Sequence, residues 1–263
     1  QIRILDAEGR TVRTLTGTRE RGLNRVWWDL RGEPTRQARL RTPPLYAPEV
    51  QPGPEGWRPA PGLGTLSILM PPGSYTVVLS VGGREERQPL EVRKDPNSGG
   101  SVEEILEQTR LLEEIRADLE AVVDMVNTIE LVRAQLQSLR RTLAADGAPA
   151  ALKAATDLPA AADSLEQKFI AVEENLHQLR LTGRGQDNLR WPAKLGAKLL
   201  YLANGIASSD FGPTRQQREV AALLREEVRR NRAALDALLR TELPAFNERL
   251  RQRGVANVIA AAP

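Results

Sequence analysis

The chain has 263 residues, no cysteine, and a nearly balanced charge of 37 basic against 34 acidic residues. This length exceeds the usual size of one domain, roughly 100 to 200 residues, so two domains are expected. The lack of cysteine excludes disulfides, zinc–thiolate sites, iron–sulfur clusters and thiol nucleophiles, and the charge balance gives no footprint for nucleic acid. No apolar run approaches the ~18 to 20 residues of a membrane span.

The first 97 residues predict an immunoglobulin-like β-sandwich. Ile2 and Ile4 alternate with polar residues as in a strand, and the Asp and Gly of DAEGR at 6–10 favour a hairpin turn. The aromatic and β-branched run LNRVWWDL at 23–30 predicts a further strand. A second hairpin is expected over 75–92 around a Gly-Gly turn.

Trp27 and Trp28 test the strand predicted at 23–30. Neighbouring residues of a strand face opposite sides, so only one of the two can fill a sandwich core. Truncating that one to Ala should cost roughly 3 to 5 kcal/mol, and truncating the other much less.

A proline-rich insertion at 32–64 interrupts the sandwich. Its eight prolines forbid a regular ladder or helix, so we expect a long surface loop. Long loops are usually functional, and Tyr46 and Trp57 are therefore the candidate interaction surface, for a partner domain or a sugar ring. The alternative is that both side chains pin the loop to its own sandwich.

Residues 101–263 predict an antiparallel up-and-down bundle of about four helices. A Pro- and Gly-containing linker at 94–100 precedes Ser101 and Glu104, which have the S-x-x-E spacing of a capping box. Apolar residues at steps of three and four then predict each helix. The expected helices run from Ser101 to about Ala145, where Asp146-Gly147 ends the first, from about 158 to 181, from Pro192 to about 208, and from 213–214 onward with a kink or restart near Thr241 before Pro244.

Neither half offers catalytic chemistry, and no cofactor or metal is expected. His177 is the only histidine and has no partner ligand at metal-binding spacing. The many helix carboxylates, Glu173 and Glu174 among them, lack Glu-x-x-His pairs and are expected on a solvated face paired with Arg. Phosphate-loop and G-x-S-x-G signatures are missing. We therefore expect no hydrolase activity.

The segments IRILDAEGRTVRTL, GLNRVWWDLRGEP and PPGSYTVVLSVGGREERQPLEVRKDP resemble the immunoglobulin-like module of the flagellar hook-cap family. The later segments WPAKLGAKLLYLANGIASSDFGPTRQQREV and LPAFNERLRQRGVANVI look like the C-terminal region of bacterial sortilin-like or sialidase-repeat β-propeller proteins, often labelled glycosyl hydrolases. In such proteins any glycosidase-like site belongs to the upstream propeller.

The resemblance implies a non-catalytic accessory region of a larger exported bacterial protein, located in the periplasm, at the cell surface or outside the cell. Its expected partner is the upstream β-propeller or another protein, with no nucleic acid and no membrane span. Two alternatives remain: sugar contacts for a glycan-active enzyme, or a self-assembling scaffold. Because each half has a complete pattern, cleavage at 94–100 is expected to release two folded fragments.

Overall fold

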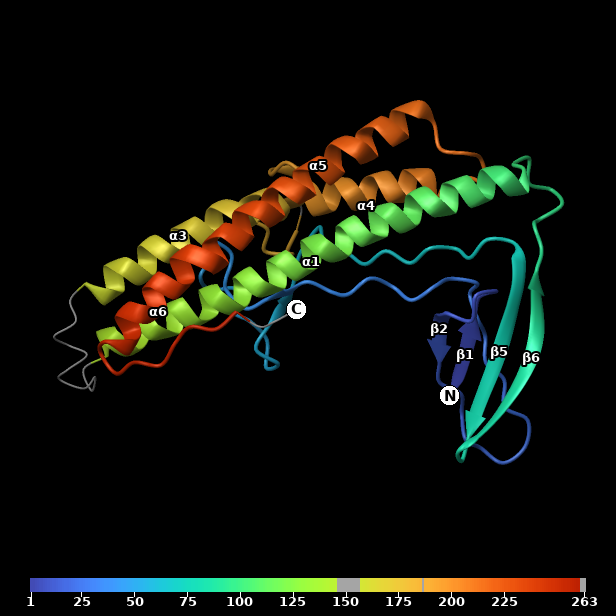
Figure 1. Ribbon diagram of the computed structural model, residues 1–263, viewed down its shortest axis with the longest axis horizontal. Helices are drawn as coiled ribbons and strands as arrows, with labels where there is room; N and C mark the ends of the chain where they lie inside the picture. Colours follow the sequence, from blue (N-terminus) through green and yellow to red (C-terminus); the bar gives the residue numbers. More distant parts are fainter. Residues whose placement is uncertain (146–156, 186, 261–263) are drawn as a thin grey trace. The chain divides into compact units, whose positions relative to one another are not determined.

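The chain folds as a mixed α+β protein with one small antiparallel sheet and a set of helices (Figure 1). The computed structural model describes residues 1–145, 157–185 and 187–260. None of the helices in these ranges is long and apolar enough to cross a membrane.

The chain forms two compact units, each built from three separate stretches. Unit 1 contains Gln1–Thr35, Thr65–Ala117 and Leu202–Val220, and unit 2 contains Arg36–Gly64, Asp118–Tyr201 and Ala221–Pro263. This division differs from the sequence-based boundary at 97–101, because most of the proline-rich insertion belongs with helices. Whether the two predicted domains fold separately stays a prediction for the cleavage experiment.

Unit 1 contains a four-stranded antiparallel sheet in the order β2-β1-β5-β6. Its strands are β1 (Ile2–Leu5), β2 (Thr11–Leu15), β5 (Gly73–Val81) and β6 (Arg84–Val92). Both predicted hairpins are present. The β5–β6 turn needs its two glycines, because Gly82 and Gly83 both have positive φ values. L side chains rarely adopt this left-handed region.

Both faces of the sheet contain buried side chains. Ile4 and Tyr75 are buried on one face, Val78 is buried on the opposite face, and the Tyr75 hydroxyl donates a hydrogen bond of 2.7 Å to the carbonyl of Pro71. Burial raises the pKa of Tyr75 to about 12. The edge strand β6 is almost entirely exposed and carries charged residues and Pro89, which discourage pairing with further strands.

The strand predicted over 23–30 is wrong, because this stretch is irregular. The side chain of Asn24 donates to the carbonyls of Glu20 and Gly22, a local turn that competes with strand pairing. Leu30 then has a positive φ, which also interrupts an extended chain. Among the described residues, the β-pairing next to this stretch is one isolated antiparallel bridge between Arg31 and Leu69.

The two tryptophans nevertheless differ as neighbours on an extended chain do. Trp27 is 80% exposed, whereas Trp28 is half-buried. The Trp28 indole packs edge-on against Tyr75 at 5.7 Å between ring centroids, and its Nε1 donates to the carbonyl of Arg31 at 2.9 Å. Trp28 is thus a partial cover for the sheet and no central plug.

We expect Trp28→Ala to lower the free energy of unfolding by about 2 kcal/mol, less than a full core truncation, because the ring is only half-buried. Trp27→Ala should cost less than about 0.5 kcal/mol, since its ring lies mostly in solvent. Urea denaturation of both variants checks the difference. Equal losses would contradict the placement of the two rings.

The helices begin and end close to their predicted positions. The first helix starts with the predicted capping box, in which the Ser101 amide donates to Glu104 Oε2 and the Glu104 amide donates to Ser101 Oγ. Its predicted end at Asp146-Gly147 lies outside the described residues. The elements are α1 (Val102–Ala144), α3 (Leu158–Leu176), the 3₁₀ turn η1 (Asp187–Leu189), α4 (Leu195–Ile206), α5 (Arg215–Ala237), the π-turn η2 (Leu238–Glu242) and α6 (Leu243–Arg251).

Two helix ends have a clear local cause. The π-turn η2 ends two residues before Pro244 and α6 follows it, which confirms the restart predicted near Thr241, because proline cannot donate to the preceding turn. The second helix ends earlier than predicted, at Leu176 instead of 181, since His177 has extended backbone angles.

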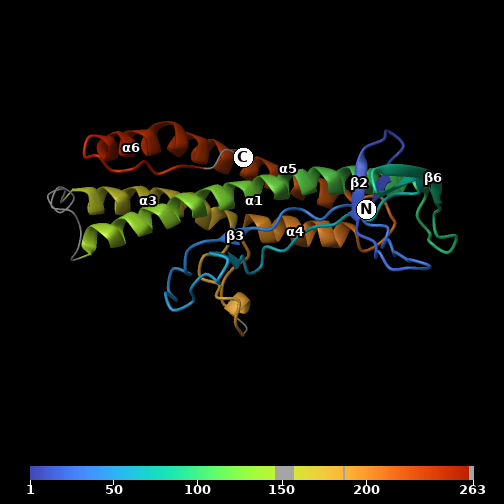
Figure 2. The same cartoon turned by 90° about the horizontal axis from the view of Figure 1, so that it is seen from below.

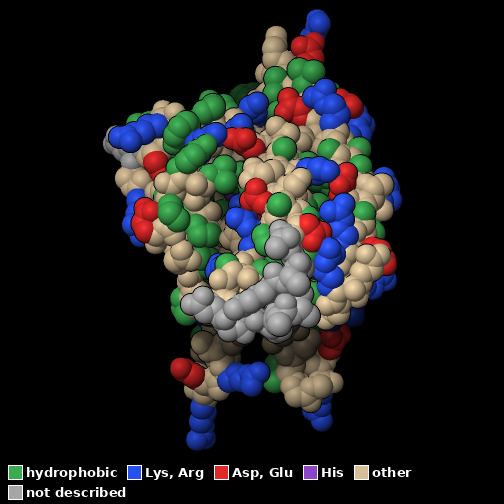
Figure 3. Space-filling model, turned by 90° about the vertical axis from the view of Figure 1, so that its left-hand side faces the viewer, with side chains coloured by type: hydrophobic (Ala, Val, Ile, Leu, Met, Phe, Trp, Pro, Cys, Tyr) green, Lys and Arg blue, Asp and Glu red, His purple; other side chains and the backbone are tan. Residues whose placement is uncertain are grey.

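In unit 2, α3 lies beside the second half of α1 in both ribbon views (Figures 1 and 2). The apolar stripes predicted for these helices are buried; they include Leu119, Val122, Val126, Ile129, Val132, Leu136, Leu165, Phe169, Val172 and Leu176. On the surface, Lys and Arg side chains alternate with Asp and Glu, as the view onto one end shows (Figure 3). This mixture agrees with the balanced charge of the sequence.

Candidate functional site

A row of polar side chains on α1 holds the proline-rich segment in unit 2. Glu120, Asp124, Asn127 and Glu130, here called the acceptor row, follow one another at steps of four, three and three residues. Residues at this spacing lie on one face of a helix. The row therefore offers a line of oxygen atoms to a chain that runs along the helix.

The residues from 36 to 42 use this row through their backbone amides. The Arg36 amide donates to Glu120 Oε1 at 2.9 Å, and the Arg39 amide to Asn127 Oδ1 at 2.7 Å. The amides of Arg41 and Thr42 both donate to Glu130 Oε2, the second at 2.8 Å. Side-chain oxygens of the helix thus satisfy backbone amides of this segment that would otherwise need other partners.

The row ends in a group of buried charges that we call the buried charge network: Glu130, Arg133, Glu166, Glu173 and His177. The Arg133 guanidinium donates to Glu130 Oε1 and to Glu173 Oε2, each at 2.7 Å. His177 Nε2 lies 2.9 Å from Glu173 Oε1. All five side chains are nearly inaccessible to solvent. Burial of this kind is sustained only by close pairing.

The proline-rich segment closes the network from outside. The Thr42 hydroxyl lies 2.7 Å from Glu130 Oε1, and Arg58 Nε donates to the Thr42 carbonyl at 3.0 Å. Arg58 is in β4 (Arg58–Pro59), which pairs with β3 (Arg39–Leu40) in a two-residue ladder. The short ladder and the acceptor row together fix the path of this segment over α1.

The environment shifts the pKa values of Glu130 and Glu173 in opposite directions. Burial, followed by the negative charge of Glu173, raises the pKa of Glu130 to about 8. Burial alone would also raise the pKa of Glu173, but Arg133 and His177 outweigh it and hold that pKa below its usual value. Of the groups bonded to Glu130, the Thr42 hydroxyl can turn to accept a hydrogen bond from the protonated Glu130 carboxyl group.

The raised pKa of Glu130 predicts that stability falls as pH rises. Between the usual value of 4.5 and about 8, the folded state binds a proton at Glu130 that the unfolded state has lost. The free energy of unfolding should therefore decrease from about pH 5.5 to about pH 8.5, and Glu130→Gln should remove most of this decrease. Urea denaturation at both pH values checks it, and parallel pH profiles would contradict it. The low pKa of Glu173 acts only below this window.

The network has little capacity for chemistry on an external molecule. Its carboxylates accept hydrogen bonds from Arg133, Thr42, Gln137 and Arg140, and its imidazole is sealed from solvent. Within the described ranges, no group of three or more His, Asp or Glu residues is arranged to hold a metal ion. The arrangement serves to anchor a polypeptide segment.

The position predicted for one member of the network differs from the observed one. Glu173 was expected on a solvated face, which is wrong, because it is fully buried against Arg133 and His177. Glu174 does pair with an arginine, Arg180, at 2.6 Å. A signal was present in the sequence, since Glu130 and Arg133 each directly follow a buried residue of the α1 stripe.

The predicted interaction residue Tyr46 is 73% exposed, directly beyond the anchored segment. The Arg180 guanidinium lies 5.4 Å from the Tyr46 ring centroid and 5.0 Å from that of Trp191. We call Tyr46, Arg180 and Trp191 the aromatic–arginine cluster. The Leu45 amide donates to the Leu179 carbonyl at 3.2 Å, and this bond joins the two stretches of chain that carry Tyr46 and Arg180.

Trp57 has a different environment. Its ring lies 5.1 Å from the Arg39 guanidinium, within the proline-rich segment itself, and it is only partly exposed. This contact joins two parts of the proline-rich segment, and whether Trp57 binds a partner stays a prediction. Trp191 was not among the predicted interaction residues, although WPAK is conspicuous in the sequence.

Comparisons with known proteins identify no relative of the chain. No family model, no curated protein and no solved structure matches the chain.

Proposed function

We propose that this chain is a non-catalytic accessory region of a larger exported bacterial protein and that it docks through the aromatic–arginine cluster. In this proposal the sheet of unit 1 derives from a hook-cap-type immunoglobulin-like module, the helices form a bundle, and the partner is an upstream β-propeller. The proposal rests on the sequence resemblance and on the way unit 2 presents Tyr46.

The observation that carries the proposal is a rigidly held, exposed aromatic residue. The acceptor row and the buried charge network fix residues 36–42, and the Leu45 amide adds a further anchor just before Tyr46. A side chain displayed on a fixed backbone loses little entropy on binding. Tyr, Trp and Arg are also the residue types that dominate binding energy in interfaces.

The test begins with the reading frame upstream of the codon for Gln1. The encoded segment is produced separately, and its affinity for this chain is measured by calorimetry. Combined Tyr46→Ala and Trp191→Ala should weaken binding at least about tenfold. Tyr201→Ala is the matched control, since Tyr201 is 84% exposed elsewhere in unit 2. An upstream segment without propeller repeats, or an unchanged affinity of the double variant, would refute the proposal.

A second candidate is contact with a sugar at the rim of a glycan-active site. The observation that favours it is the exposed Tyr46 ring beside the Arg180 guanidinium, since an aromatic face and a hydrogen-bond donor together suit a pyranose. Glycan-array binding by the chain, lost in Tyr46→Ala and kept in Tyr201→Ala, would support it. Binding that is lost in a Trp57 variant instead would place the sugar contact at Trp57 and Arg39.

A further inference from the structure

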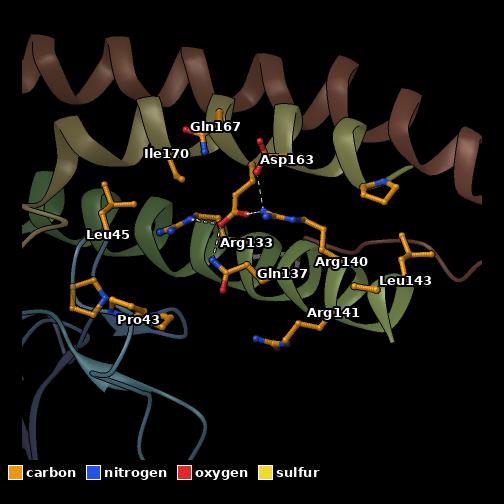
Figure 4. A pocket seen from close by; sticks show the side chains of 15 residues that line it. Pro43, Leu45, Arg133, Gln137, Arg140, Arg141, Leu143, Asp163, Gln167 and Ile170 are labelled. Atoms are coloured by element: carbon orange, nitrogen blue, oxygen red, sulfur yellow. Dashed lines mark hydrogen bonds and ion pairs between the residues drawn. The ribbon is translucent and has the colours of Figure 1, made fainter. Parts of the chain in front are cut away.

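Unit 2 contains a pocket of about 690 Å³ between α1, α3 and the proline-rich segment (Figure 4). Its size lies in the range of small-molecule sites. Its lining includes seven apolar residues: Pro43, Pro44, Leu45, Pro48, Leu143, Pro159 and Ile170. In Figure 4, Pro43 and Leu45 lie on one side of Arg133 and Arg140, and Leu143 lies on the other.

Between these apolar residues, a wall of the pocket is cationic. Three guanidinium groups, those of Arg133, Arg140 and Arg141, line the pocket together with two carboxylates, those of Asp163 and Glu166. Arg140 pairs with both carboxylates, at 2.9 Å and 3.0 Å. In the part of the chain that the structure describes, Arg141 has no ion pair, so one positive charge at this wall is uncompensated. In Figure 4 the Arg141 side chain is turned away from Arg133 and Arg140.

Below this wall, Arg133 has an unpaired donor that solvent does not reach. Arg133 Nε is buried and has no hydrogen-bond acceptor, and the Arg133 side chain is only 3% exposed. Glu166 Oε1 lies 3.5 Å from it, an ion-pair distance that is too long for a good hydrogen bond. Gln137 donates to that same oxygen at 2.6 Å. Because this atom is sealed from solvent, Arg141 is the unpaired guanidinium that an incoming anion reaches.

We propose that this pocket binds a small organic carboxylate with a branched aliphatic body. The carboxylate pairs with the Arg141 guanidinium, which supplies the unpaired charge. The aliphatic part packs on Pro43, Leu45 and Ile170. No residue that lines the pocket belongs to the aromatic–arginine cluster, and this proposal does not rest on the proposed docking function.

The test compares 4-methylpentanoate with its uncharged amide, 4-methylpentanamide, as probes of the ¹H–¹⁵N NMR spectrum of the full chain. The acid should give saturable shifts at residues of the pocket, and the amide should bind at least about tenfold more weakly, since it lacks the charge that Arg141 attracts. Arg141→Gln should weaken the binding of the acid by a similar factor. Because Arg141 is exposed, this variant should fold normally.

Arg240→Gln is the matched control, an exposed arginine elsewhere in unit 2, and it should leave the affinity for the acid unchanged. Three results would overturn the proposal: equal binding of acid and amide, unchanged affinity in Arg141→Gln, or the absence of saturable shifts up to roughly 50 mM acid, beyond the millimolar range expected of a weak small ligand.

Discussion

Replacement of Arg133 by Met is expected to lower the free energy of unfolding by about 3 to 5 kcal/mol. The guanidinium lies 2.7 Å from carboxylate oxygens of both Glu130 and Glu173, and all three side chains are almost completely buried. Its removal leaves buried carboxylates without the charge that compensates them, and the surrounding helices cannot admit water without opening. Urea denaturation near neutral pH measures the loss.

The chain offers a matched control for this variant. Arg229 pairs with Glu226 at the same three-residue helical spacing, but both side chains are largely exposed. Arg229→Met should therefore cost less than about 0.5 kcal/mol. The triple variant Glu130→Gln, Arg133→Met, Glu173→Gln should regain part of the stability, since no buried charge is then unpaired. Equal losses at Arg133 and Arg229 would show that the network contributes no more than a surface ion pair.

Replacement of Gly100 by Ala is expected to cost about 3 kcal/mol, at the upper end of overpacking effects. A Cβ at this position would lie 1.9 Å from the carbonyl oxygen of Asp210, so one of the two backbones must move. Both residues belong to unit 1. Thermal and urea unfolding of the variant measure the effect.

Gly205→Ala is the control for Gly100→Ala, because nothing lies within 4 Å of its added Cβ. Gly205 is in α4, where alanine favours the helix by up to about 1 kcal/mol, so this variant should be neutral or more stable. A Gly100→Ala protein as stable as the parent would mean that the chain passes Asp210 less closely than described. The contact also bears on cleavage at 94–100, since the linker ends in a packed residue.

Local chemistry explains what the sequence predicted correctly. The Gly82-Gly83 turn, the Ser101 capping box and the break before Pro244 each depend on residues within a few positions of one another. The errors depend on distant partners. The strand at 23–30 needed a neighbouring strand that the described residues do not supply, and Glu173 needed a cation on another helix. Periodicity marks which face of a helix is inside, but it does not reveal a charge that is buried with its counter-charge.

The acceptor row imposes an order of events during synthesis. The amides of Arg36, Arg39 and Thr42 leave the ribosome 84 to 88 residues before Glu120, Asn127 and Glu130, their acceptors. At about 5 to 20 residues per second, the segment waits roughly 4 to 18 seconds for its partners. During that time its amides are hydrated and free to join other strands, and its prolines, which cannot donate to a ladder, reduce that hazard. The composition of the segment thus protects a nascent chain as well as shaping the finished one.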